Sequence, residues 1–316
     1  MIKVYKYEKG DVHEVGVNEL SSPATIWADC HNPTKADLQE LSEKAGLNAS
    51  DIKEALDKEE RPRLFDMDNY TQIVFRAPYF ENDEISTTPV TILISKKLNN
   101  VITLRLHELR TVTTFHQLIK DGKYSIFERG VSYFVYRFLD EIFNTYFLVL
   151  DEVEEQIDKI EDEVIEKPDK KTVRQIFVIK KTLIYFHKSL TANREVITAI
   201  EKEYASNITK RDIQHFRMLY HDVVQLIDMV ATYRDVLTGT LDLYLSAVSQ
   251  TLSNVMKKLT AMGSFVLIPT LIASVYVMNF RYLPELEWKY GYFFSLGLMV
   301  LSVTFLYIYF KKKNWL

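Results

Sequence analysis

Hydrophobic positions near the C-terminus form two long runs that contain no charged residue. The first extends from Leu259 to Phe280, between Lys258 and Arg281, and the second covers residues 290–310. Each run has the roughly 20 residues that an α-helix needs to cross a bilayer core of about 30 Å. The pattern therefore predicts two transmembrane helices, 259–280 and 290–310, joined by a short loop over residues 281–289.

Small and polar residues in and before the first run fall on one face of the predicted helix. They recur in steps of seven, four and three, which keeps them on one side of a helix with about 3.6 residues per turn. A membrane helix places such a stripe against protein or water rather than lipid. The positions are Asp242, Ser249, Ser253, Thr260, Gly263, Thr270 and Ser274, and the apolar Met256 and Leu267 lie between them on the same face.

The residues of this stripe support two interpretations equally. Its hydroxyl groups could line a path for a partly hydrated cation, with Met256, Leu259 and Leu267 as apolar constrictions that gate by dewetting. Two spans cannot enclose such a path, so several chains would have to form a ring around it. Alternatively, the small residues allow close packing of one helix on another.

The segment before the spans, residues 128–258, has helical periodicity almost throughout. The pattern predicts three long helices, over residues 128–167, residues 168–205 and from about residue 210 through the first span to residue 279. The first carries a narrow apolar seam on an otherwise acidic surface, which predicts that it packs on other helices. The seam consists of Val153, Ile157, Ile160 and Val164.

Residues 1–127 mix strand and helix signals. A helix is expected from Pro33 to Lys44, ended by Gly46, and another from Asn48 to a point before Arg61. Five segments are rich in β-branched and aromatic residues and predict strands. They are residues 4–7, 24–28, 71–77, 90–94 and 100–106, the last two joined by a hairpin-like connection. The chain as a whole is therefore predicted to be α+β, with an N-terminal α/β domain, a stalk of long helices and a membrane hairpin.

Composition and charge narrow the classes of function. The 316 residues are 47% hydrophobic and 26% charged, with a net charge of −4. The last 58 residues hold five Lys or Arg and two Asp or Glu, a charge of +3, so the remainder carries −7. An acidic soluble part argues against nucleic acid as a partner and is compatible with a cation. A single cysteine, Cys30, excludes an internal disulfide framework and is expected to be a small core residue.

The basic residues around the spans predict their orientation. The loop between the spans has balanced charges, whereas lysines flank the other end of each span, so the positive-inside rule places both chain ends in the cytosol and the loop outside. No signal peptide is expected, because the N-terminal residues are charged and lack an apolar core. The flanking lysines are Lys257, Lys258, Lys311, Lys312 and Lys313, the last three within a basic tail over residues 311–316.

An enzyme is not expected. The seven histidines form no pair with the helical spacing of metal ligands; His215 and His221, for example, lie six residues apart on different faces. The neighbours Asp29, Cys30 and His31 contain groups used in nucleophilic catalysis, but adjacent residues of a strand point to opposite sides of the sheet.

The end of the first span carries a recognisable motif. The sequence Tyr276-Val277-Met278-Asn279-Phe280, followed by Leu283-Pro284-Glu285-Leu286, resembles the Tyr-Gly-Met-Asn-Phe signature of the CorA family of divalent-cation transport channels, chiefly for magnesium. The basic C-terminal end, residues 310–316, is similar to the family's cytosolic end. The resemblance extends over nearly the whole chain, including residues 60–63 and 232–237.

This resemblance implies a homopentamer with a cytosolic funnel and a central pore lined by the first membrane helix. Val277, Met278 and Asn279 would form the external ion-binding motif, with Asn279 contacting the water shell of Mg²⁺. Lys311, Lys312 and Lys313 would form a basic collar at the cytosolic side. The residues implied to line the pore are Ser253, Met256, Leu259, Thr260, Gly263, Leu267, Thr270 and Ser274.

The family also has regulatory cation sites between neighbouring funnels, which the resemblance transfers to Glu54 and Asp242. Carboxylates from two chains repel each other unless a hard cation bridges them, so cytosolic Mg²⁺ would stabilise the ring and provide feedback. Without the resemblance, the sequence would favour solvated surface acids at Glu54 and Asp242; with it, a shared cation site is favoured.

Two positions depart from the family pattern. Val277 stands where the family has Gly, which permits backbone angles and close approach that a β-branched residue resists. Ser253 stands where many members have Asn. The sequence therefore favours potential-driven magnesium uptake through a channel in the cell membrane, with Mg²⁺ as substrate and regulatory ligand, cobalt and nickel as further ions and no organic cofactor. The alternatives are a zinc or other transition-metal carrier of the same family and a non-conducting, membrane-anchored cation sensor.

Overall fold

The computed structural model describes residues 1–48, 56–81, 84–166, 169–279 and 288–315. The chain divides into two compact units. The first consists of Met1–Glu163 with Asp169–Thr240, and the second of Val164–Pro168 with Leu241–Leu316.

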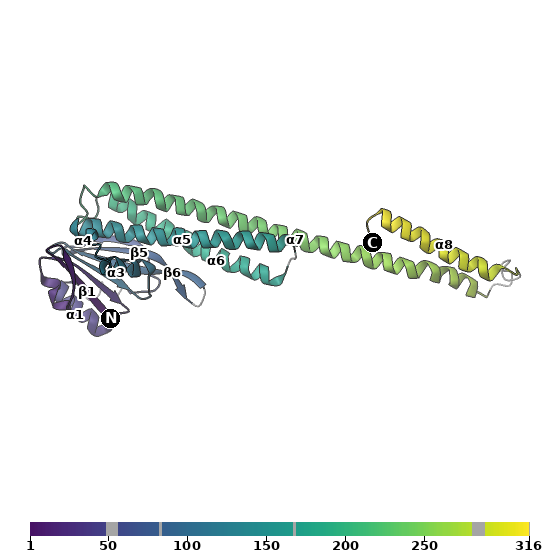
Figure 1. Cartoon of the computed structure of the whole chain (residues 1–316), viewed down its shortest axis with the longest axis horizontal. Helices are drawn as coiled ribbons and strands as arrows, with labels where there is room; N and C mark the ends of the chain where they lie inside the picture. The colour runs from purple at the N-terminus through teal and green to yellow at the C-terminus, as the bar shows by residue number, and fades with distance from the viewer. Residues whose placement is uncertain (49–55, 82–83, 167–168, 280–287, 316) are drawn as a thin grey trace. The chain divides into compact units, whose positions relative to one another are not determined.

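A seven-stranded sheet forms the base of the first unit (Figure 1). Its order is β2-β1-β3-β7-β6-β5-β4, and all neighbours are antiparallel except β3 and β7, which pair in parallel with Ile26 opposite Asn100. The strands are β1 (Ile2–Glu8), β2 (Asp11–Val15), β3 (Thr25–His31), β4 (Arg63–Asp66), β5 (Tyr70–Glu81), β6 (Glu84–Ser95) and β7 (Asn100–Arg105).

All five strand segments expected from the sequence lie in this sheet, as β1, β3, β5, β6 and β7, and the hairpin between β6 and β7 is confirmed. Strands β2 and β4, at the two edges, were not expected. The helix expected after Pro33 is α1 (Lys35–Ala45). Thr34 caps it in a reciprocal capping box with Asp37, and Gly46 ends it at a φ of 65°. The second expected helix, from Asn48, lies largely outside the described residues.

Successive side chains of β3 point to opposite faces of the sheet and so belong to two different hydrophobic cores. Ile26, Ala28 and Cys30 face the layer that contains α1 and the short 3₁₀ helix η1 (Val17–Ser21), where they pack with Leu20 and Leu41. On the other face, the Trp27 ring contacts Phe115 and Phe134, with ring centroids 5.9 and 5.5 Å apart. The sheet is thus covered on both faces, by α1 on one side and by longer helices on the other (Figure 1).

Helices that begin after β7 either cover the second face or pack on the helices that cover it. These are α3 (Arg110–Lys120), α4 (Ser125–Glu128), α5 (Val131–Glu166), α6 (Lys170–Glu201) and α7 (Ile213–Val277). The sequence placed the start of the first long helix at Glu128, but Gly130 interrupts it with a φ of 87° and α5 begins at Val131. The other two long helices start and end within a few residues of their expected bounds.

The apolar seam expected on the first long helix is buried, and α7 carries buried leucines of its own. In α5, Val153, Ile157 and Ile160 are almost fully removed from solvent, as are Leu219 and Leu226 in α7. Helix α6 lies against β5 and β6. Its buried Asn193 binds the backbone of β5 at Arg76, accepting from the amide at 3.0 Å and donating to the carbonyl at 2.9 Å.

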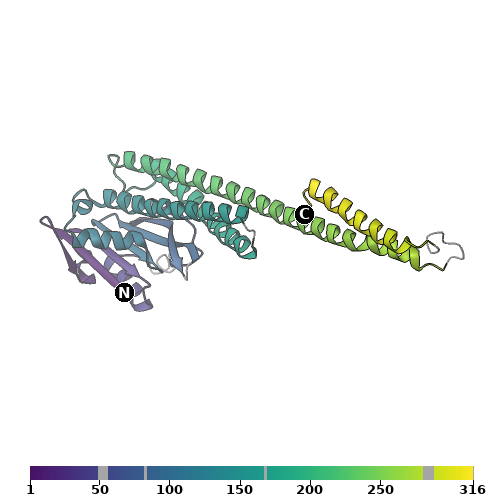
Figure 2. The same ribbon diagram turned by 45° about the vertical axis from the view of Figure 1, so that its right-hand side comes forward.

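The second unit contains the C-terminal half of α7 and helix α8 (Gly291–Lys312), which run side by side (Figure 2). Within the described residues these two helices are long and apolar enough to cross a membrane. The α+β architecture is therefore present as expected, with an N-terminal sheet domain, long helices and two apolar C-terminal helices. The homopentamer remains a prediction.

Candidate functional site

The C-terminal half of α7 has two faces with different neighbours. One face is buried or half-buried beside α8, and it consists of Ala261, Ser264, Phe265, Ile268, Ile272 and Tyr276. The positions expected to line a pore are all exposed: Ser253, Met256, Leu259, Thr260, Gly263, Leu267, Thr270 and Ser274. At 3.6 residues per turn the centres of the two sets lie about 150° apart around the helix axis. Within one chain, α8 therefore leaves the polar stripe uncovered.

Three hydroxyl groups of the stripe donate their protons within their own helix. Thr260 donates to the carbonyl of Met256 at 2.8 Å, and Thr270 to that of Val266 at 2.7 Å. Ser274 donates to the carbonyl of Thr270 at 2.8 Å. Because each hydroxyl oxygen keeps a lone pair, the stripe between Thr260 and Ser274 presents hydrogen-bond acceptors without fixed charge. Such oxygens suit the water shell of a hard cation such as Mg²⁺.

Large apolar side chains and one glycine, Gly263, alternate with these hydroxyl groups along the helix. Met256, Leu259 and Leu267 are exposed, and nothing lies within 4 Å of the point where Gly263 would carry a Cβ. If copies of this face converged, the apolar side chains would form narrow, poorly hydrated rings, and Gly263 would mark a wider level.

The motif at the end of the first span lies where α7 ends. Val277 is the last helical residue, and the Met278 amide donates to the carbonyl of Val275 at 3.3 Å. None of Val277, Met278 and Asn279 has a positive φ. Valine at the family's glycine position is therefore unstrained here, because a left-handed backbone is not required. Residues 280–287, most of the external loop expected at 281–289, lie outside the described residues.

The basic residues at the other end of the hairpin are exposed. Lys311 and Lys312 lie in the last turn of α8, and Lys313 caps it. Cationic groups are favourable at a helix C-terminus, where the backbone carbonyls carry partial negative charge. The Lys311 ammonium also lies 5.7 Å from the centre of the Tyr307 ring.

An aromatic cluster that the sequence analysis did not find fixes this same end of α8. The Phe310 ring lies 5.8 Å from that of Phe265, edge to face, and stacks on Trp315 at 5.5 Å. Phe310 is 5% exposed and Ala261 is fully buried. The cluster contacts α7 on the face opposite the stripe, so it determines which way the stripe points relative to α8.

Only one of the two residues of the predicted regulatory site lies within the described part of the chain. Asp242 is exposed on α7, while Glu54 lies outside the described residues. Within the described part of the chain, no group of three or more His, Cys, Asp or Glu side chains is placed to hold a metal ion. A site shared by Glu54 and Asp242 therefore stays a prediction.

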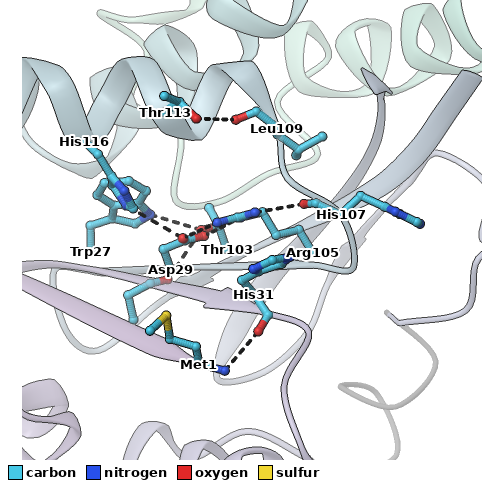
Figure 3. A network of polar contacts seen from close by, with 11 residues as sticks. Met1, Trp27, Asp29, His31, Thr103, Arg105, His107, Leu109, Thr113 and His116 are labelled. Atoms are coloured by element: carbon cyan, nitrogen blue, oxygen red, sulfur yellow. Dashed lines mark hydrogen bonds and ion pairs between the residues drawn. The ribbon is translucent and has the colours of Figure 1, made fainter. Parts of the chain in front are cut away.

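The neighbours Asp29, Cys30 and His31 do not assemble for catalysis. Figure 3 shows the polar contacts of Asp29. Cys30 lies in the core on the α1 side, and burial raises the pKa of its thiol far above the usual range. Asp29 points to the other face, where it accepts from Arg105 Nε at 3.0 Å and Nη2 at 2.8 Å and from Thr103 Oγ1 at 3.1 Å. Asp29 is thus a buried structural ion-pair residue.

Comparisons with known proteins agree over the whole chain. The family model described as "CorA-like Mg2+ transporter protein" matches residues 22–312. The chain is 36% identical to the cobalt/magnesium transport protein CorA of Methanocaldococcus jannaschii over 320 residues, covering 100% of both chains. It is 30% identical to the protein of the same name from Thermotoga maritima, covering 98% of this chain and 89% of the relative.

A solved structure gives the same result. The complete structure of the CorA magnesium transporter from M. jannaschii matches with a TM-score of 0.89 at 33% identity, covering 100% of this chain and 99% of that one. The family model, the two relatives and this structure all name CorA transport proteins. The chain belongs to the CorA-like Mg²⁺ transporter family.

Proposed function

We propose that this chain is one subunit of a ring-shaped channel, a homopentamer in the cell membrane, that takes up magnesium into the cytosol. The observation that carries the proposal is the position of the stripe on α7. Its hydroxyl oxygens and apolar side chains are exposed on the face away from α8, where further copies of the chain can surround them. Helix α8 would then face the lipid.

The route of the ion follows from this arrangement. Asn279 would bind the hydrated ion at the outer mouth, with Val277 and Met278 shaping the site, and the ion would pass along the stripe to Met256 and Ser253. The stripe carries no formal charge between Thr260 and Ser274, so the ion would keep part of its water shell.

Membrane potential supplies the driving force in this proposal. Moving two positive charges inward gains about 4.6 kcal/mol per 100 mV, so uptake would need no nucleotide hydrolysis. The lysines flanking the two spans favour cytosolic chain ends. Lys311, Lys312 and Lys313 would surround the cytosolic exit, and a Mg²⁺ ion between Glu54 of one chain and Asp242 of the next would close the channel when cytosolic magnesium is high.

A transport assay distinguishes a magnesium channel from a transition-metal carrier of the same architecture. Purified protein is placed in liposomes that contain a magnesium-sensitive dye, and uptake is measured with cobalt, nickel and zinc as competing ions. We expect magnesium uptake that is lost in Asn279→Ala. Uptake of zinc in preference to magnesium would instead indicate a transition-metal carrier.

The Val277→Gly variant tests the departure from the family motif. Because Val277 is helical and unstrained, we expect transport by the natural protein. Uptake seen only in Val277→Gly would mean that valine disables the mouth. Absence of flux in both proteins, with an intact ring by light scattering, would refute the channel and favour a non-conducting sensor.

A further inference from the structure

A cavity of about 410 Å³ opens on the first unit, where β5, β6 and α6 meet the segment 58–62. This volume is in the range of pockets that hold small organic ligands, about 300–1,000 Å³. The cavity has no part in the proposed ion path, which belongs to α7 residues of the second unit.

The floor of the cavity is polar and held in place by hydrogen bonds. The hydroxyl oxygens of Thr87 and Ser189 lie 2.8 Å apart, and both residues are buried. Arg76 donates from Nε to Thr87 Oγ1 at 3.1 Å and from Nη1 to the carbonyls of Lys58 and Glu60 at 3.1 and 3.0 Å. The guanidinium therefore fixes the segment 58–60 against β6, and the floor is preformed.

Positive charge predominates at the rim. Lys58, Arg61 and Lys188 are exposed and line the cavity, and none of the three has an acidic partner within 4 Å among the described residues. Of the two acids in the lining, Glu60 is already paired with Arg63 at 2.9 Å. Unpaired cations around a pocket of hydroxyl groups favour an anionic ligand, and phosphate oxygens in particular.

Aromatic rings form part of the wall. The rings of Tyr79 and His107 lie 4.2 Å apart, tilted by 31°, and Tyr185 adds a partly exposed ring. Such rings provide a flat surface on which a base stacks. An inorganic phosphate ion would leave most of the cavity empty and would use none of this surface.

We propose that this cavity binds a nucleoside polyphosphate, with the phosphates at Lys58, Arg61 and Lys188 and the base against the Tyr79–His107 wall. The site is independent of the ion path and would make the cytosolic part of the protein a nucleotide-binding module. The proposal stands whether or not the protein conducts magnesium.

The test is calorimetric titration of ATP into the full-length protein in detergent, with EDTA present. Adenosine and tripolyphosphate are titrated as separate probes. The double variant Arg61→Gln/Lys188→Gln removes two rim cations at exposed positions, and Ala192→Phe fills the cavity without changing charge. Lys170→Gln is the matched control, because Lys170 is an exposed lysine on the same helix about 27 Å from Lys188 at 1.5 Å per residue.

We expect saturable ATP binding with a dissociation constant below about 1 mM, weakened about tenfold in the double variant and unchanged in Lys170→Gln. Ala192→Phe should also weaken binding about tenfold while keeping the melting temperature of the natural protein. The proposal is overturned if ATP gives no saturable heat, if both charge variants weaken it equally, or if neither cavity variant weakens it. Tripolyphosphate binding as tightly as ATP would also overturn it, because the base would then contribute nothing.

Discussion

Replacing Asp29 with Asn removes the negative charge from a buried ion pair while keeping the shape of the side chain. Asp29 is 2% exposed and Arg105 is 7% exposed. The carboxylate accepts two hydrogen bonds from Arg105 and one from Thr103, and Trp27 Nε1 in turn donates to Thr103 Oγ1 at 3.1 Å. In the variant an NH2 donor replaces one carboxylate oxygen, so the buried Arg105 guanidinium keeps the remaining amide oxygen and the His107 carbonyl as acceptors but loses its counter-charge.

The expected cost follows from that unpaired charge. Removing one partner of a buried ion pair costs about 3–5 kcal/mol, because the other charge remains desolvated. With a urea dependence of about 3 kcal/mol per molar, the midpoint of unfolding should fall by about 1.0–1.7 M. Thr103→Val keeps the ion pair and loses hydrogen bonds with neutral and charged partners, so it should cost about 1–2 kcal/mol.

The assay is urea unfolding of the full chain in detergent, followed by Trp27 fluorescence in a Trp288→Phe/Trp315→Phe background. Lys159→Gln is the control, because it breaks an exposed pair with Glu155 on one helix, worth about 0.3–0.5 kcal/mol. An Asp29→Asn shift no larger than that of Lys159→Gln would refute the reasoning. The double variant Asp29→Leu/Arg105→Met, which removes both charges, should be more stable than Asp29→Asn.

Three further predictions concern other parts of the molecule. Gly263→Val should leave the melting temperature unchanged, because the Cβ of the new side chain meets no neighbour in the chain, yet it should reduce magnesium uptake at least tenfold. The control is Ala273→Val, on another face of α7. Equal flux in the two variants would argue against a pore at this stripe. Phe310→Ala should lower the melting temperature of the detergent-solubilised protein far more than Phe305→Ala, because Phe310 is 5% exposed and Phe305 is 66% exposed. Similar effects of the two substitutions would contradict the packing of α8 on α7. Burial alone would raise the pKa of Asp66, but hydrogen bonds from two hydroxyl groups and an ammonium outweigh burial and hold the pKa below its usual value. The stability supplied by this carboxylate is therefore present above about pH 4 and is lost as the pH falls further. The urea midpoint of Asp66→Asn should accordingly fall less than that of the natural protein between about pH 5 and pH 2.5.

Periodicity was sufficient to predict the long helices and both apolar spans, because their patterns repeat over many turns. The edge strands β2 and β4 were not predicted, and the reason is physical. Each is short and mostly solvent-facing, so neither has the alternation of a half-buried strand. Helix α3 was also missed, since Leu109 at its start offers no capping side chain and its buried face includes Thr111.

Pairings between distant residues could not be predicted from one sequence. Asp29 and Arg105 lie 76 positions apart and meet only because β3 and β7 are parallel neighbours. The contact of Phe310 with Phe265 likewise depends on how α8 aligns with α7. The polar stripe was predictable because it lies on one helix, whereas its exposure on the side away from α8 required the structure.

The internal hydrogen bonds of the stripe bear on how the protein is made. Each hydroxyl proton of Thr260, Thr270 and Ser274 is already bound to a carbonyl of the same helix, so these three groups bring no unpaired donor into the hydrocarbon. The span also contains no charged residue that would need a partner subunit during insertion. In the proposed ring, a single chain would therefore insert its hairpin into the bilayer before it meets another copy, and assembly would follow as a separate, later step within the membrane.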